Sequence, residues 1–172
     1  MKRGVGRGGQ IDSWREVFTG MDPFGWPFAP WVRAGGVLYP TDGLHLTRGQ
    51  YKALAAALVS TGESGFFLSV VESEGLGFQS RSWGHWWCEQ MSYEEYRDLH
   101  LTLENAIYSK DGGWGILISH EMHAVEGGRA EFLGAFTAAY ATWTEDLHAL
   151  RAEWTNNPNS DWMRSLPEFV NL

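Results

Sequence analysis

The chain has 172 residues, of which 44% are hydrophobic and 20% charged, so it can form one domain with its own core and is not disordered throughout. The formal net charge of −8 disfavours a nucleic acid partner, because phosphate contacts require lysine and arginine. Cys88 is the single cysteine, which excludes an internal disulfide and fits a reducing compartment. The ten tryptophans can each bury about 150–250 Å² and should supply much of the core.

The first forty residues combine a glycine-rich start with a segment dense in aromatic rings. Residues 1–10 are basic and contain four glycines, which predicts a flexible tail ahead of a single domain over residues 11–172. Residues 11–18 fit a short helix or a turn. Residues 21–31 hold three prolines and four aromatic residues, which favours an extended arm laid over the core. Residues 31–39 have the composition of a strand.

Residues 47–60 carry the signals of a helix. Thr47 fits an N-cap, alanine and leucine favour the helical interior, and Gly62 lies at the expected C-terminal stop. Residues 65–73 and 82–90 are rich in β-branched and aromatic residues, and we predict a strand in each.

The middle of the sequence contains two strong local signals. Ser92 and Glu95 have the spacing of a capping box, which predicts a helix from this point to about Asn105. Residues 105–109 and 113–125 flank an Asp-Gly turn, which predicts two strands joined as a hairpin.

A long helix is predicted over residues 129–156, where apolar residues recur every three or four positions, and a helical turn over residues 161–166. The mixture of hairpins and helices indicates an α+β fold, with an antiparallel sheet of about four to six strands packed against helices. No apolar run is long enough to span a bilayer and none follows the basic N-terminus as in a signal peptide, so we expect a cytoplasmic protein without membrane contact.

The stretch LISHEMHAV places His120 and His123 close together inside a predicted strand. Alternate strand residues point to opposite faces, so these two side chains are not expected to bind one metal ion, and the helical H-E-x-x-H zinc motif is not matched. The alternative is a zinc site of His85, Cys88, His120 and His123, which requires each pair to lie in a turn. We expect no metal and no cofactor.

An enzyme is the second functional hypothesis, either metal-dependent or hydrolytic. It would use His85, His120, Glu121 and His123, with Glu121 and His123 as an acid–base pair on one strand face. Cys88 could act as a nucleophile, although a cysteine among tryptophans is more often an inert core residue.

A protein-binding surface is the hypothesis that the charge and the aromatic residues favour. The strand over residues 82–90 is bulky on both faces, so one face needs a cover, whether a helix, the aromatic arm or a partner. Carboxylates cluster near this strand and the following helix, where they could attract a basic protein or simply favour the helix dipole. The candidate partner-binding residues are Glu72, Glu74, Trp83, Trp87, Glu89, Glu94, Glu95 and Asp98.

The tryptophan-rich strand, the hairpin over residues 105–125 and the long C-terminal helix together resemble the small cytoplasmic immunity proteins of bacterial polymorphic toxin systems. The resemblance covers residues 65–155 and carries no diagnostic motif, so no functional residue is transferred from it. It implies a non-catalytic α+β protein that binds and neutralises a cognate toxin, such as a basic nuclease. A third hypothesis is a structural or regulatory module that forms a homodimer through exposed tryptophans.

Overall fold

The computed structural model describes residues 7–71, 84–155, 157 and 161–171. In chain order the elements are α1 (Arg7–Val17), β1 (Gly35–Leu38), α2 (Arg48–Thr61), β2 (Gly65–Val70), β3 (His85–Glu89), α3 (Tyr93–Arg97), β4 (Asn105–Tyr108), β5 (Trp114–Ile118), β6 (Ala124–Gly128), α4 (Ala130–Ala139), α5 (Trp143–Trp154), α6 (Asp161–Arg164) and β7 (Val170–Asn171). None of the helices within these described ranges is long and apolar enough to traverse a bilayer.

The seven strands of the described residues form one sheet in the order β3-β2-β4-β5-β6-β1-β7. The first six of these strands pair antiparallel, whereas the short β7 pairs parallel with β1. The predicted α+β class with an antiparallel sheet is therefore confirmed, and β7 is an addition that no sequence pattern indicated. Strands β3 and β7 lie at the two ends of the sheet.

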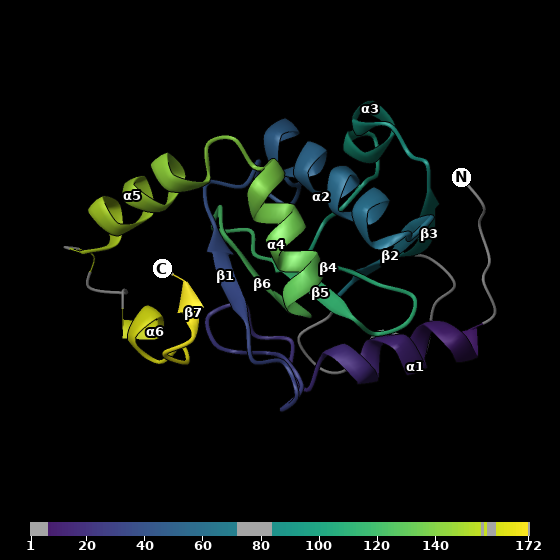
Figure 1. The fold of residues 1–172 in the computed structure, drawn as a ribbon, viewed down its shortest axis with the longest axis horizontal. Coiled ribbons are helices and arrows are strands. Elements are labelled where there is room, and N and C mark those ends of the chain that lie inside the picture. Colours follow the sequence, from purple (N-terminus) through teal and green to yellow (C-terminus); the bar gives the residue numbers. More distant parts are fainter. Residues whose placement is uncertain (1–6, 72–83, 156, 158–160, 172) are drawn as a thin grey trace.

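Helices cover both faces of the sheet, because alternate strand residues point to opposite sides and both sets are apolar. Helices α2 and α4 lie side by side on one face, over a core that contains Leu68 and Ile116 (Figure 1). Helix α1 and the aromatic arm cover the other face, where Phe28 of the arm joins a core with Phe67 and Leu117. A third apolar cluster beyond β1 joins α5, α6 and β7.

The C-terminal helical region is divided into α4 and α5 instead of forming one helix over residues 129–156. At Tyr140 the backbone leaves the helix with φ −88° and ψ 91°. The buried Tyr140 hydroxyl donates to the Asp146 carboxylate at 2.6 Å and accepts from the Gln50 amide at 3.0 Å, and Thr142 also donates to Asp146 at 2.6 Å. These hydrogen bonds stabilise the break between α4 and α5, although apolar residues continue to recur every three or four positions across it.

The prediction of one strand over residues 113–125 is wrong after Ile118. Strand β5 ends at Ile118, and residues 119–123 form a turn closed by a hydrogen bond from the Ser119 amide to the His123 carbonyl at 2.9 Å. Met122 in this turn has φ 62°, a left-handed conformation that is uncommon for methionine. Residue types gave no sign of a turn here.

The helix caps predicted from sequence are present. The Thr47 hydroxyl accepts a hydrogen bond from the backbone N–H of Gln50 at 3.3 Å at the start of α2. Ser92 with Glu95 forms the predicted capping box of α3. Helix α3 nevertheless ends at Arg97 and does not continue to Asn105. Leu99 and Leu101 are both buried. Residues two positions apart share a side of an extended chain but not of a helix, so this pair fits an extended segment after α3. At the other end of the chain, α1 begins at Arg7, within the predicted tail.

Candidate functional site

The four residues of the alternative zinc site do not converge. His85 and Cys88 lie on β3, at one end of the sheet, whereas His120 and His123 lie in the turn between β5 and β6. Strand β3 is three strand spacings from β5, which is about 14 Å at roughly 4.8 Å per spacing. Among the described residues no three His, Cys, Asp or Glu side chains gather as metal ligands would. The structure therefore assembles neither this zinc set nor an active site that combines His85 with Glu121.

His120 and His123 have opposite environments because the turn exposes one ring and buries the other. The exposed His120 contacts the Glu104 carboxylate. The His123 ring is fully buried, its Nε2 donates to the Pro23 carbonyl at 3.0 Å, and it stacks on Trp162 with ring centroids 4.7 Å apart. Burial lowers the pKa of His123, so its ring is neutral at physiological pH. His123 thus joins the aromatic arm to α6 and has the features of a structural residue.

Cys88 is buried in the core beneath α2, and burial raises the pKa of its thiol to about 12. A thiol with this pKa stays protonated at neutral pH, whereas a nucleophilic cysteine needs a thiolate. The hypothesis of Cys88 as a nucleophile therefore finds no support in its surroundings.

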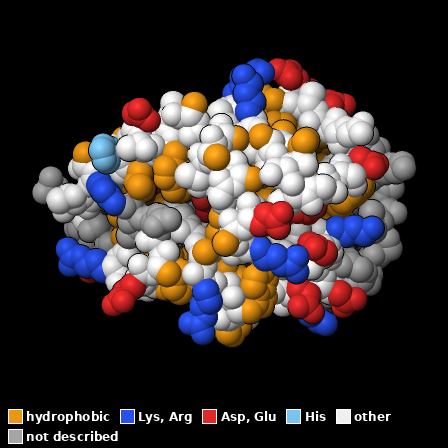
Figure 2. Space-filling view, in the orientation of Figure 1, with side chains coloured by type: hydrophobic (Ala, Val, Ile, Leu, Met, Phe, Trp, Pro, Cys, Tyr) orange, Lys and Arg blue, Asp and Glu red, His pale blue; other side chains and the backbone are white. Residues whose placement is uncertain are grey.

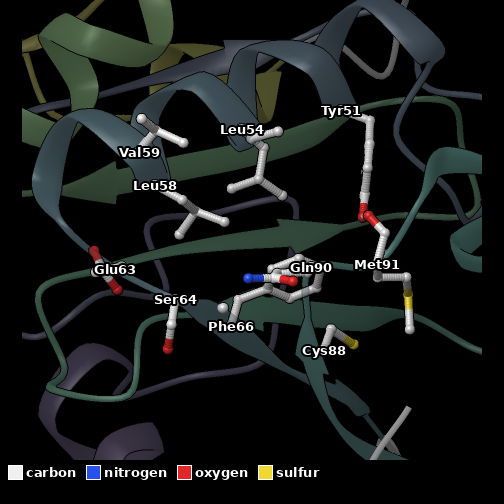
Figure 3. A pocket seen from close by; sticks show the side chains of 12 residues that line it. Tyr51, Leu54, Leu58, Val59, Glu63, Ser64, Phe66, Cys88, Gln90 and Met91 are labelled. Atoms are coloured by element: carbon white, nitrogen blue, oxygen red, sulfur yellow. The ribbon is translucent and has the colours of Figure 1, made fainter.

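A groove of about 230 Å³, here called the α2–β3 groove, opens between α2 and the end of the sheet that carries β2 and β3. Leu54 and Leu58 point from α2 toward Phe66 on the strands below (Figure 3). Met91 lies at one end of the groove and Glu63 at the other. The lining is mostly apolar, so the groove suits hydrophobic side chains better than a polar substrate.

The rim of the α2–β3 groove includes two exposed apolar residues of α2. Val59 is 81% exposed, the highest value among the large hydrophobic side chains that the structure describes as exposed, and Ala55 is also exposed. An apolar residue at this level of exposure beside an apolar groove is a feature of binding surfaces.

The predicted acidic residues that the structure describes lie at the end of β3 and on α3, on either side of the groove residues Gln90 and Met91 in the sequence, and several already have partners within the chain. Glu94 forms an ion pair with Arg48 at 2.8 Å, and the hydrogen bond from that guanidinium lowers the pKa of the carboxyl group. Glu95 accepts the Ser92 amide in the capping box, which lowers its pKa. Glu89 and Asp98 are exposed at the end of β3 and of α3. Glu72, Glu74 and Trp83 lie outside the described residues.

The tryptophans of β3 are divided between the two faces of the sheet, as the alternation predicted. Trp86 packs against the core beneath α2 and α4, and Trp87 packs against the core beneath α1 with its ring centroid 5.1 Å from that of Phe67. Both are half-buried, so the covers on the two faces come largely from this chain's own helices.

Sequence analysis missed Glu126, a glutamate in the interior strand β6 that is 2% exposed. The signal that could have identified it is a lone acidic residue in the run AVEGG, where a strand covered on both faces should have apolar side chains.

Comparison of the chain with protein-family models, with curated proteins and with solved structures finds no match.

Proposed function

We propose that this chain is a non-catalytic protein-binding module that receives apolar side chains of a basic protein partner in the α2–β3 groove. The observation that supports this most directly is the apolar lining of the groove combined with the 81% exposure of Val59 at its rim. A partner that covers Val59 and fills the space above Leu54 and Leu58 removes apolar surface from water, which is the main driving force of protein association.

The charge of the chain favours a basic partner. The sequence carries 21 acidic against 13 basic residues, and Glu89, Glu95 and Asp98 are exposed at the end of β3 and on α3, whose connection contributes Gln90 and Met91 to the groove. Complementary charge mainly accelerates association, so binding is expected to slow at high salt while the apolar contacts keep the complex together.

The specific form that we propose is an immunity protein that neutralises a cognate toxin, with a basic nuclease as the partner class. This is the function implied by the resemblance of residues 65–155 to immunity proteins, and it agrees with the acidic charge. A nuclease must present a basic surface to nucleic acid, and an acidic protein can compete for that surface.

The test is co-expression of the chain with each protein encoded beside its gene, scored by growth rescue and by co-purification. Ala55→Arg places a long cation on the groove rim, whereas Ala56→Arg makes the same change on an exposed position of α2 that does not line the groove. We expect Ala55→Arg to abolish rescue and to weaken binding at least tenfold, and Ala56→Arg to behave as the unmodified chain.

Equal rescue by both variants would rule out the α2–β3 groove as the interface. Rescue of no neighbouring protein by the unmodified chain would rule out the immunity function. Sedimentation of the chain alone tests the homodimer alternative. If the chain is a dimer and Ala55→Arg dissociates it, the groove binds a second copy of this chain.

A further inference from the structure

Glu126 is a buried carboxylic acid on β6, an interior strand of the sheet. Strand β6 lies between β5 and β1, and Glu126 is in register with Ile116 on one side and Gly36 on the other. Its neighbour Val125 packs in the core beneath α1, so Glu126 faces the side covered by α4. The side chain is 2% exposed, and its Oε2 makes no hydrogen bond among the described residues. Such buried unpaired groups are rare in folded proteins and need a specific explanation.

The Glu126 carboxyl group lines a pocket of about 470 Å³ between β1, α4 and the start of α5. Helix α4 contributes small residues such as Ala130 and Gly134, and a Cβ added at Gly134 would meet no atom within 4 Å. Trp143 and Phe169 contribute aromatic side chains from the other side. Hydrophobic side chains reach the surface in this region, between α4 and α5 (Figure 2).

The absence of a side chain at Gly36 brings the Trp143 ring and the Glu126 carboxyl group together. A Cβ at Gly36 would lie 2.7 Å from Cη2 of Trp143 and 3.3 Å from Oε1 of Glu126, so both groups border the same small volume above β1. A carboxylate supplies charge and hydrogen-bond acceptors to a cation, and the face of an indole ring attracts a cation as well.

No positive side chain lines this pocket among the described residues, where Glu126 is the one ionisable group. Charged residues that lie close in sequence to the lining residues but do not line the pocket are Arg33, Arg129, Glu131, Glu145, Asp146 and Glu168. Arg129 pairs with Asp111 at 3.3 Å, and Asp146 accepts hydrogen bonds from Tyr140 and Thr142. The site therefore has an acceptor and aromatic walls, and the described part of the chain provides no cation to balance the carboxylate.

We propose that this pocket binds a primary ammonium or guanidinium group, with Glu126 as its counter-ion and Trp143 as its aromatic wall. Lysine and arginine side chains of a protein carry this chemistry, and so do free small amines. The pocket lies toward the β1 end of the sheet and the α2–β3 groove at the β3 end, so this proposal and the proposed function can each fail alone.

The protonation state of Glu126 predicts how the affinity of this pocket depends on pH. Burial raises the pKa of Glu126 to about 8, so its carboxyl group is mostly protonated at neutral pH. A cation binds the ionised form, and binding therefore releases one proton. Affinity should rise with pH by up to about tenfold per unit below pH 8 and level off above it. A ligand held by the neutral acid as a hydrogen-bond donor would show the opposite trend.

The experiment is a titration of the full chain with n-butylammonium and n-butylguanidinium, followed by NMR of the amide and indole N–H groups. We expect saturable shifts in α4 and at the Trp143 indole, and none with the neutral n-butanol. Glu126→Gln should weaken binding at least tenfold. Gly134→Leu, which fills the pocket and leaves the carboxyl group in place, should also weaken it tenfold or more. Glu131→Gln makes the same chemical change on α4 outside the pocket and should leave binding unaltered.

A blocked tripeptide with a central lysine or arginine distinguishes the two sources of the cation. Binding at least as tight as that of the free amine assigns the pocket to a protein side chain, and loss of binding assigns it to a small amine. Absence of saturable shifts with both amines, equal affinity in Glu126→Gln, or tighter binding as pH falls from 8 to 6 would each overturn the proposal. Thermal unfolding of each variant confirms that it is folded.

Discussion

Glu126 and His123 lie three positions apart at the β5–β6 hairpin, and burial shifts their pKa values in opposite directions. Burial disfavours the charged form of both groups, so it raises the pKa of the carboxyl group and lowers that of the imidazole. The fold therefore accommodates a protonated Glu126 and a neutral His123. The contribution of Glu126 to stability declines as pH rises from 4.5 toward 8, and that of His123 declines as pH falls below about 6.5, the ordinary pKa of histidine, so between pH 4.5 and 6.5 the two contributions oppose each other.

Glu126→Gln is expected to remove the loss of stability that Glu126 causes as pH rises toward 8. Between pH 4.5, the ordinary pKa, and pH about 8, the folded state keeps a proton that the unfolded state has lost. The free energy of unfolding should therefore fall with rising pH by up to about 1.4 kcal/mol per unit. Urea unfolding at pH 5.5, 7 and 8.5 measures this slope. The same pH slope in both proteins would show that Glu126 is not a buried acid.

His123→Ala is expected to lower the free energy of unfolding by about 2–3 kcal/mol, because it removes a buried hydrogen bond to Pro23 and the stacking on Trp162. His120→Ala on the same turn is exposed and should change it by less than about 0.5 kcal/mol. Chemical denaturation at pH 7.5 compares the two. Losses of similar size would mean that the turn does not place the two rings as described.

At the scale of elements, the packing of α1 on the sheet depends on a glycine in β5. A Cβ at Gly115 would lie 2.5 Å from Cζ of Phe18 and 2.7 Å from Cγ1 of Val17. Gly115→Ala should therefore cost about 1–3 kcal/mol of stability and loosen α1. Gly134→Ala, in open space on α4, should be neutral or stabilising by up to about 1 kcal/mol.

Calorimetric or denaturant unfolding of Gly115→Ala and Gly134→Ala tests this pair, and proteolysis within residues 12–18 reports the release of α1. Unchanged stability in Gly115→Ala would contradict the close approach of Val17 and Phe18 to β5.

Elements that are specified by local chemistry were predictable from the sequence. The caps of α2 and α3 need only residues within a few positions, namely Thr47 with Gln50 and Ser92 with Glu95. The Asp-Gly turn between β4 and β5 likewise depends on local backbone preferences. The aromatic arm also lies over the core as expected, since its prolines leave little alternative to an extended path.

Features that depend on distant contacts were not predictable. The break at Tyr140 requires Gln50, which is 90 positions away, and the apolar period alone favours one continuous helix. The turn at residues 119–123 has no glycine or proline to mark it, and His123 is placed by a carbonyl 100 positions away. The candidate site shows the same limit: the helix signals over residues 47–60 identified α2, but not the groove that Leu54 and Leu58 form with Phe66.

At the scale of the whole molecule, the sheet separates two surfaces with different chemistry. The α2–β3 groove at one end is apolar with acidic residues nearby, and the Glu126 pocket toward the other end combines a carboxyl group with aromatic rings. Both suit partners that carry apolar and positively charged groups, in agreement with the net charge of −8. A partner large enough to contact both surfaces would have to reach across the α2–α4 face.

Hydrogen–deuterium exchange of the chain, alone and in complex with the partner found by co-expression, tests the central claim of binding through the α2–β3 groove most directly. Slower exchange is predicted in residues 51–66 and 88–91, the segments that contribute the groove lining, and this protection should disappear with Ala55→Arg. Protection confined to α5 and α6, with residues 51–66 unchanged, would contradict it.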